Sequence, residues 1–361
     1  MKVKLTEICT PKQWKTIPTN ALLEDGYPVY GANGIIGYYD EYNHEEPVIA
    51  ITCRGATCGT INLTVPKAYI TGNAMCLDNV CADVLPDYLY YCLLHYNFNN
   101  IISGSAQPQI TRQGLAKVEI ELHPIIEQGK IINSLRKSKA IINARQSQLQ
   151  KLDDLVKARF VEMFGDCKSR VSMNELCSII TDGTHQPPRF QESGIPFIFV
   201  SNLVGNVVTY NAEKFISEDT YAELYKRTPI EIGDLLLSTV GSYGHPAVVT
   251  EDRKFLFQRH IAYLKPRHNM VNSFYLHSAL LAPDGQRQIE EKVKGIAQKT
   301  LNLSEIKKIV VPLPTIEEQN QFEKFVNQTD KSKLQVPSGN ALCIRYPIFY
   351  RNNIFERSIK C

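Results

Sequence analysis

The residues best able to do chemistry in this 361-residue chain are its ten cysteines and eight histidines. Two cysteine pairs, Cys53 with Cys58 and Cys76 with Cys81, share a C-x4-C spacing. Structural zinc sites usually use the tighter C-x2-C pair together with histidine. The spacing therefore favours buried thiols over a metal site, and we expect no metal in this chain.

Motifs that mark catalysis are missing or broken. The sequence contains no G-x-S-x-G elbow, no H-E-x-x-H and no Walker loop. The segment Gln186-Pro187-Pro188-Arg189-Phe190 approaches the motif with which amino-methyltransferases hold a base, but Gln replaces the acid or amide and Arg the aromatic residue. Glycines at 31, 34 and 37 precede strand-like residues instead of a helix, so they predict a hairpin with Asn33-Gly34 at its tip.

Polar and basic side chains on predicted loops are a second set of candidate functional residues, because such groups contact phosphates and base edges. They are also the ordinary composition of surface loops, so recognition and simple exposure both remain open. The candidate contacts are Asn33, Arg54, Thr57, Gln107, Gln109 and Arg112 in the first half, and Thr184, His185, Arg189, Ser242, Tyr243, His245, Gln298 and Lys299 in the second.

An internal duplication positions these loops. Gln107 and Gln298 lie 191 positions apart, and so do Gln128 and Gln319, with matching apolar residues between them and no gap. Shared spacing over more than twenty residues indicates a repeat. The chain is therefore predicted to be two copies of a strand-rich unit, each followed by a helix.

The first of these helices is predicted over 124–164. Its apolar residues recur at steps of three and four, which is typical of a helix that packs against another helix. At roughly 1.5 Å per residue it would form a rod of order 60 Å, long enough to act as a spacer. The predicted seam is Ile125, Ile132, Leu135, Ile142, Leu149, Val156, Phe160 and Met163, with Ile316, Phe322 and Val326 on the second helix.

The second helix is predicted to be shorter, because Pro337 and Gly339 end it. We therefore expect the seam from Leu149 to Met163 to lack a partner within this chain. The predicted divisions are a first unit over 1–123, a long helix over 124–166, a second unit over 167–314, a short helix over 315–335 and a divergent tail over 336–361.

Composition is compatible with a soluble, cytoplasmic protein. The net charge is only +3, although the segment 124–164 holds eight Lys or Arg against four Asp or Glu. A basic helix suits phosphate steering and ordinary solubility equally well. No apolar run approaches the length that spans a bilayer, and the first ten residues do not resemble a signal peptide.

Several segments together resemble the specificity subunits of type I restriction-modification systems. They are Asp182-Gly183-Thr184-His185 with Gly194-Ile195-Pro196-Phe197-Ile198, the turn 233–237 with Gly241, the stretch 28–38, and the two helix entries 124–128 and 314–319. The resemblance covers the chain from Met1 to about Gln335.

The resemblance implies an α+β fold with two target-recognition domains, each reading half of a bipartite DNA site, and helices that pair as an antiparallel coiled coil. It also implies a subunit without catalysis of its own. Double-stranded DNA, two methyltransferase subunits and restriction subunits are the implied partners. S-adenosylmethionine, ATP and Mg are then cofactors of those partners, with none in this chain.

Two other functions stay open from the residues alone. One is a protein-binding scaffold in which two similar domains grip a polypeptide. The other is a self-contained DNA adenine methyltransferase, which the missing glycine-rich cofactor loop argues against. Self-association through the incomplete coiled coil is a further expectation.

Overall fold

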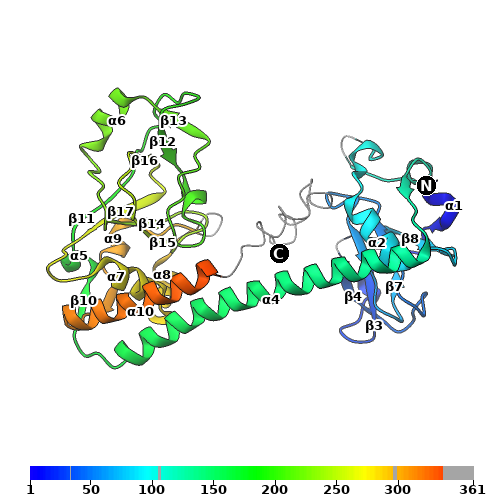
Figure 1. Cartoon of the computed structure of the whole chain (residues 1–361), viewed down its shortest axis with the longest axis horizontal. Helices are drawn as coiled ribbons and strands as arrows, with labels where there is room; N and C mark the ends of the chain where they lie inside the picture. Colours follow the sequence, from blue (N-terminus) through cyan, green and yellow to red (C-terminus); the bar gives the residue numbers. More distant parts are fainter. Residues whose placement is uncertain (33, 105–106, 296–298, 336–361) are drawn as a thin grey trace. The chain divides into compact units, whose positions relative to one another are not determined.

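A computed structural model describes the chain except for residues 33, 105–106, 296–298 and 336–361 (Figure 1). It divides into two compact units, with Met1–Ala144 in unit 1 and Arg145–Pro337 in unit 2. The division falls inside one continuous helix, α4 (Ile125–Phe164), whose first half belongs to unit 1 and whose second half belongs to unit 2.

Unit 1 contains a four-stranded antiparallel sheet in the order β2-β8-β5-β6 and a three-stranded sheet in the order β4-β3-β7. The inner strand β5 is buried along its whole length, and its first three residues, Ile49 to Ile51, are apolar. The strands are β1 (Lys2–Lys4), β2 (Thr10–Lys12), β3 (Tyr27–Gly31), β4 (Gly34–Tyr39), β5 (Ile49–Thr52), β6 (Ile61–Leu63), β7 (Tyr69–Ile70), β8 (Ala74–Asp78) and β9 (Glu119–Glu121).

Helix α2 (Pro86–His95) packs into the main core of unit 1 through Leu89 and Leu93. It begins with a proline at its first turn, where no backbone N–H is needed. The other helical segments of unit 1 are α1 (Leu5–Ile8), η1 (Thr19–Ala21), η2 (Phe98–Asn100) and α3 (Arg112–Leu115).

Unit 2 repeats this plan strand for strand. Its sheets run β11-β17-β14-β15 and β13-β12-β16, and the pair β10-β18 matches β1-β9. Within the described residues each unit has nine strands in the same order. The strands of unit 2 are β10 (Arg170–Ser172), β11 (Cys177–Asp182), β12 (Ile195–Ile198), β13 (Lys214–Ile216), β14 (Leu235–Ser238), β15 (Pro246–Val248), β16 (Leu256–Phe257), β17 (Ile261–Pro266) and β18 (Val310–Pro312).

The repeat extends to single hydrogen bonds. Gln128 and Gln319 are both fully buried at the start of their helices. The Gln128 amide donates to Asp83 O and His123 O and accepts from Leu85 N, at 2.8–2.9 Å. Gln319 makes the equivalent three bonds, to Met270 O, Pro314 O and Asn272 N. The predicted α+β fold with two similar units is confirmed.

Unit 2 carries two helices that have no counterpart in unit 1 within the described residues. Helix α6 (Glu218–Tyr225) lays Tyr221 and Leu224 against the small sheet β13-β12-β16. Helix α8 (Pro283–Lys292) follows α7 directly. The remaining helices are α5 (Met173–Leu176), η3 (Val200–Leu203), α7 (Ser273–Leu281), α9 (Leu303–Ile306) and α10 (Ile316–Gln335).

Helix α10 packs antiparallel to the second half of α4. Phe322 lies 5.5 Å from Phe160 between ring centroids, and Lys333, near the far end of α10, pairs with Asp153 at 2.7 Å. The contact moves toward the start of α4 as α10 proceeds, which is the antiparallel arrangement (Figure 1).

The expectation that Leu149 to Met163 lacks a partner is therefore wrong for most of that stretch. Phe160 is 4% exposed, and Val156 and Met163 pack against the same core as Phe322 and Val326. An antiparallel helix that starts beside Phe164 must cover the end of α4 first. Because α10 is short, it does not reach the earlier part of α4.

The rest of the predicted seam is uneven. Ile132 and Ile142 are buried, Leu135 and Leu149 are partly exposed, and Ile125 is 44% exposed. Ile316 on α10 is also partly exposed. No described helix combines the length and apolar character needed to cross a membrane.

Candidate nucleic-acid interface

The candidate residues of unit 1 gather where two loops meet. Arg54 and Gln109 face each other as an isolated antiparallel bridge, and both side chains are exposed. Gln107 and Arg112 are exposed on the same loop and its following helix. Thr57 instead serves the hairpin, because its hydroxyl donates to Ala32 O at 2.7 Å. Asn33 lies outside the described residues.

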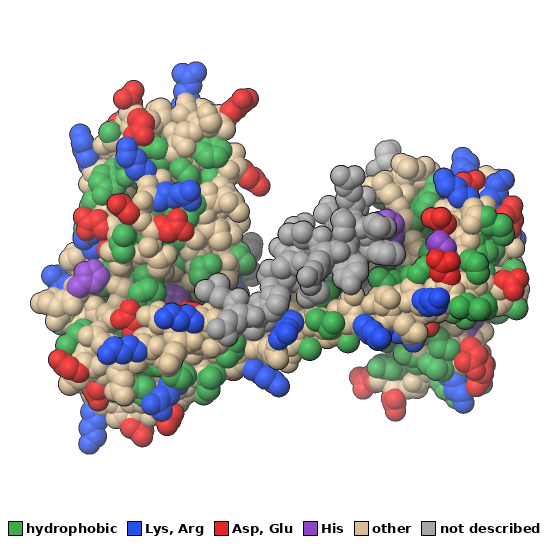
Figure 2. Space-filling model, in the orientation of Figure 1, with side chains coloured by type: hydrophobic (Ala, Val, Ile, Leu, Met, Phe, Trp, Pro, Cys, Tyr) green, Lys and Arg blue, Asp and Glu red, His purple; other side chains and the backbone are tan. Residues whose placement is uncertain are grey.

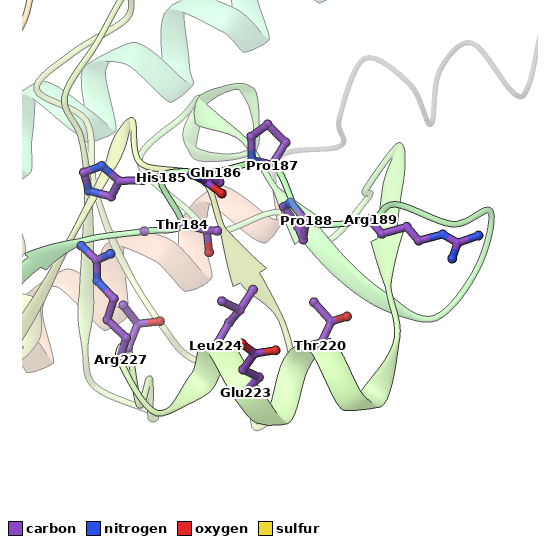
Figure 3. Close-up of a pocket in the computed structure, with 12 residues that line it drawn as sticks. Thr184, His185, Gln186, Pro187, Pro188, Arg189, Thr220, Glu223, Leu224 and Arg227 are labelled. Carbon is purple, nitrogen blue, oxygen red and sulfur yellow. The ribbon is translucent and has the colours of Figure 1, made fainter.

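In unit 2, three candidates line a cleft of about 430 Å³ between the segment after β11 and helix α6 (Figure 3). Thr184, His185 and Arg189 come from that segment, which leaves the sheet at Asp182. Figure 3 shows the Arg227 side chain rising towards the ring of His185, while Arg189 points away from the cleft. We call this the α6 cleft.

Asp182 organises the cationic side of the α6 cleft. Its two carboxylate oxygens bind His185 Nε2 at 2.9 Å and Arg227 Nη2 at 2.7 Å. The Asp182 side chain is 17% exposed, whereas those of His185 and Arg227 are about half exposed. A shielded carboxylate thus orients two exposed side chains, of which the Arg227 guanidinium keeps further N–H groups that can donate to an anion or a base.

A second cleft, of about 280 Å³, is lined by Asp182 together with Arg259 and His260. The Arg259 backbone N–H donates to Thr184 O at 3.1 Å, so this turn is joined to the segment that forms the α6 cleft. Burial, followed by the neighbouring Arg259 charge, lowers the pKa of His260. Arg259 is exposed and has no carboxylate partner among the described residues.

Three further described candidates of unit 2 lie outside these two clefts. The Tyr243 hydroxyl donates to Glu290 at 2.5 Å, and Lys299 pairs with the same carboxylate at 3.0 Å. These bonds lower the pKa of Glu290 and raise that of Lys299. Ser242 is exposed on the intervening turn, and Gln298 lies outside the described residues.

His245 is turned towards the protein. Its Nδ1 lies 3.1 Å from Asn206 Oδ1, and its backbone N–H donates to Ser238 Oγ at 2.9 Å. Asn206 adopts a φ of 61°, in the left-handed region, so its loop benefits from such a restraint. This side chain has a structural contact in the free chain.

Sequence reasoning missed Asp182 as an organiser and missed Arg227, Arg259 and His260. The available signal for Arg227 was the helix before it, where Ser217 precedes the acidic Glu218 and Asp219 as a helix start. Arg227 joins Asp182 across 45 positions, a pairing that no local pattern announces.

One group of three potential metal ligands lies together in the described part of the chain: His44, Cys76 and Asp78. His44 Nε2 lies 3.0 Å from Asp78 Oδ1, and Asp78 Oδ2 accepts from Trp14 Nε1 at 3.2 Å. Burial raises the pKa of the Cys76 thiol, so a cation bound there would also have to displace the thiol proton. The group is best described as a hydrogen-bonded part of the core of unit 1.

Surface charge is mixed. On the face seen in Figure 2, acidic and basic side chains are interspersed over both units, and Lys and Arg side chains occur along α4. This face therefore carries no strong single-sign field, and the net charge of the chain is +3.

Comparison with known proteins gives a consistent picture. The type I restriction modification DNA specificity domain model matches residues 1–152 and 171–337. The EcoBI specificity subunit of Escherichia coli is 33% identical over 146 residues, which span 40% of this chain and 31% of that subunit. A putative type I restriction enzyme specificity subunit of Haemophilus influenzae is 20% identical over 347 residues, covering 91% of this chain and 87% of the relative.

Two solved structures share the fold. The S subunit of a type I restriction-modification system from M. genitalium aligns with a TM-score of 0.57 at 16% identity, over 97% of this chain and 94% of that one. A chain from a study of type I R-M complex assembly and conformational transition aligns with a TM-score of 0.54 at 18% identity, over 99% and 96%. The aligned region spans less than a third of the EcoBI subunit, whereas it spans most of these structures.

Proposed function

The chain belongs to the type I restriction modification DNA specificity family, and we propose that it reads a bipartite DNA target for a type I restriction-modification complex. Each unit would recognise one half of the target. The observation that carries this proposal is the duplication, in which two units with the same nine-strand order carry different side chains at equivalent loops.

The residues proposed to face DNA are exposed and carry polar or cationic groups. In unit 1 they are Arg54, Gln107, Gln109 and Arg112. In unit 2 they are the His185 and Arg227 pair and Arg259. Guanidinium and amide groups of this kind bind phosphates or the edges of guanine and adenine.

We propose that the chain itself is not catalytic. Methyl transfer and DNA cleavage would then be performed by two methyltransferase subunits and by restriction subunits. In support, the relatives are specificity subunits of type I restriction enzymes, and one structural neighbour comes from a study of type I R-M complex assembly. S-adenosylmethionine, ATP and Mg would be cofactors of those partners. Helices α4 and α10 are the elements we assign to partner docking, because they are long and carry mixed charge.

Methylome sequencing of cells with and without the gene tests the proposed function. One bipartite adenine motif should disappear on deletion and return on complementation. Two results together would contradict the proposal. One is an unchanged methylome, and the other is a purified complex of this chain with the methyltransferase that binds duplex DNA no more tightly at low salt than at high salt. The second result also separates DNA reading from a protein-binding scaffold.

The remaining alternative, a self-contained methyltransferase, makes a different prediction. Such an enzyme would bind S-adenosylmethionine without a partner. We expect calorimetry of the isolated chain with this cofactor to show no binding, and saturable binding with one site per chain would favour the alternative.

A further inference from the structure

One backbone arrangement occurs in both units where a glycine turn meets a second loop. In unit 1 the N–H of Ile110 donates to Cys53 O, and the N–H of Gly55 donates to Pro108 O, both at 3.0 Å. Arg54 and Gln109 lie between these two bonds and form the bridge described above.

Unit 2 contains the same two bonds. The N–H of Leu301 donates to Thr239 O at 2.8 Å, and the N–H of Gly241 donates to Lys299 O at 3.4 Å. The residues between them, Val240 and Thr300, form the corresponding bridge. Arg54 is therefore equivalent to Val240, and Gln109 to Thr300.

This pattern of bonds defines a pair of facing residues that do not hydrogen bond to each other. In such an antiparallel pair the side chains project on the same face, and the Cα atoms approach to about 4.5 Å. Each unit thus displays two adjacent side chains on a defined piece of backbone.

Glycines hold that backbone in place. Gly55 and Gly241 have φ values of 86° and 74°, in the left-handed region that favours glycine. On the second loop, Gly104 and Gly295 have φ values of 87° and 103°, and a Cβ on Gly104 would meet Gln107 O at 2.5 Å. We call this backbone, with its two loops held by glycines, the frame. It is the same in both units.

The side chains on the frame differ sharply. Arg54 and Gln109 are exposed, and neither has a side-chain hydrogen bond to another described residue. Arginine binds guanine O6 and N7 in bidentate fashion, and glutamine binds adenine N6 and N7. Val240 and Thr300 are partly buried. Both side chains contain methyl groups, which suit the C5-methyl group of thymine.

We propose that Arg54 with Gln109, and Val240 with Thr300, are equivalent specificity-determining pairs, one for each half of the target. The first pair reads a purine by hydrogen bonding, and the second reads a base by apolar contact. This inference rests on the proposed function and adds to it the positions at which the two halves diverge.

Reciprocal exchange tests the inference. The full chain, assembled with its methyltransferase, is used to select DNA duplexes from a randomised pool. The selected motifs are compared among three proteins: the parent, Arg54→Val/Gln109→Thr and Val240→Arg/Thr300→Gln. We expect a change of about 5- to 150-fold in base preference at one position, the range of a bidentate contact. The first variant should change one half-site and the second variant the other.

The unmutated half-site serves as the folding control within each variant. Lys117→Ala is the matched charge control, because Lys117 is an exposed cation of unit 1 outside the pair and outside the candidate contacts. It should leave both half-sites unchanged. If the double variant of unit 1 loses both half-sites, Gln109→Thr alone provides the measurement, since it keeps Arg54.

Two results would overturn the inference. One is an unchanged motif with uniformly weaker binding, which would make Arg54 a phosphate contact. The other is a base change in the half-site assigned to the opposite unit. A parent chain that selects no bipartite motif at all would count against the proposed function instead.

Discussion

Gln128 and Gln319 show how a single buried side chain joins a helix to the loop beside it. Each amide hydrogen bonds to two carbonyl oxygens and one N–H of the preceding segments. These three groups have no other described partner. Removing either amide would leave buried polar groups without hydrogen bonds, which is more costly than losing an exposed bond.

We expect Gln128→Ala to destabilise unit 1 by about 2–4 kcal/mol, and Gln319→Ala to destabilise unit 2 by a similar amount. Hydrogen exchange should show the loss of protection confined to the unit that carries the substitution. Gln146→Ala, on the exposed face of α4, is the control and should be nearly neutral. Equal loss of protection in both units would contradict the assignment.

His277 is a residue whose environment couples stability to pH. His277 lies on helix α7, and its Nε2 is 3.1 Å from Asn206 O. Its side chain is only partly exposed. Burial lowers the pKa of His277, and the nearby carbonyl oxygens of Asn206 and Pro246 oppose this only in part. The unfolded chain therefore takes up the proton first as the pH falls.

The stability contributed by neutral His277 should be complete above the ordinary histidine pKa of 6.5 and should decline as the pH falls through the lowered pKa. His277→Asn should flatten the fall in the melting temperature of unit 2 between about pH 7.5 and about pH 5.5. His268→Asn removes an exposed histidine and is the control. The same slope in parent and His277→Asn would show that another group is responsible.

At the scale of elements, the junction of α4 and α10 depends on aromatic packing more than on charge. Phe322 is fully buried, and its ring lies 5.5 Å from Phe160 and 5.6 Å from Phe164 between centroids. Lys333 bridges Asp153 and Asp330 but remains 27% exposed. Exposed ion pairs contribute little, whereas a buried aromatic ring contributes several kcal/mol.

Phe322→Ala should therefore cost about 3–5 kcal/mol, and Lys333→Ala less than about 1 kcal/mol, in the unfolding of unit 2. Denaturant titration followed by near-UV circular dichroism measures both. A Lys333→Ala effect as large as that of Phe322→Ala would mean that the ion pair, not the aromatic cluster, holds the helices together.

Helix α6 is one of the two described helices of unit 2 that have no counterpart in unit 1. It covers the small sheet of unit 2 and supplies Arg227 to the α6 cleft. In unit 1 the equivalent small sheet is β4-β3-β7. Its strand β4 carries Ile35, Ile36 and Tyr38, all at least 36% exposed. The inserted helix thus changes both the covering of the sheet and the chemistry of the loop edge.

At the scale of the whole molecule, DNA binding by the full chain should depend steeply on salt, because each phosphate contact releases counterions. Arg259→Ala should reduce the slope of log affinity against log salt by about one and leave the recognised motif unchanged. Arg287→Ala is the matched control, since that guanidinium already pairs with Asp284 and Glu291 on α8. A motif change in Arg259→Ala would instead assign this residue to base reading.

The duplication and the two helices could be predicted from the sequence by itself, because they rest on local periodicity and on a gapless repeat, whereas the α+β class followed from the family resemblance. The helix predicted over 124–164 is observed as α4, Ile125–Phe164. These features depend on residues close together in the chain, whose spacing reports directly on secondary structure.

Only the tertiary structure decided which side chains meet. The pairing of Asp182 with Arg227, the bridge of Arg54 with Gln109, and the covering of Phe160 by α10 join residues 45 to more than 150 positions apart. Each depends on strand register or on the antiparallel direction of a helix pair. A one-dimensional pattern contains neither, which is why the uncovered part of α4 was assigned to its wrong end.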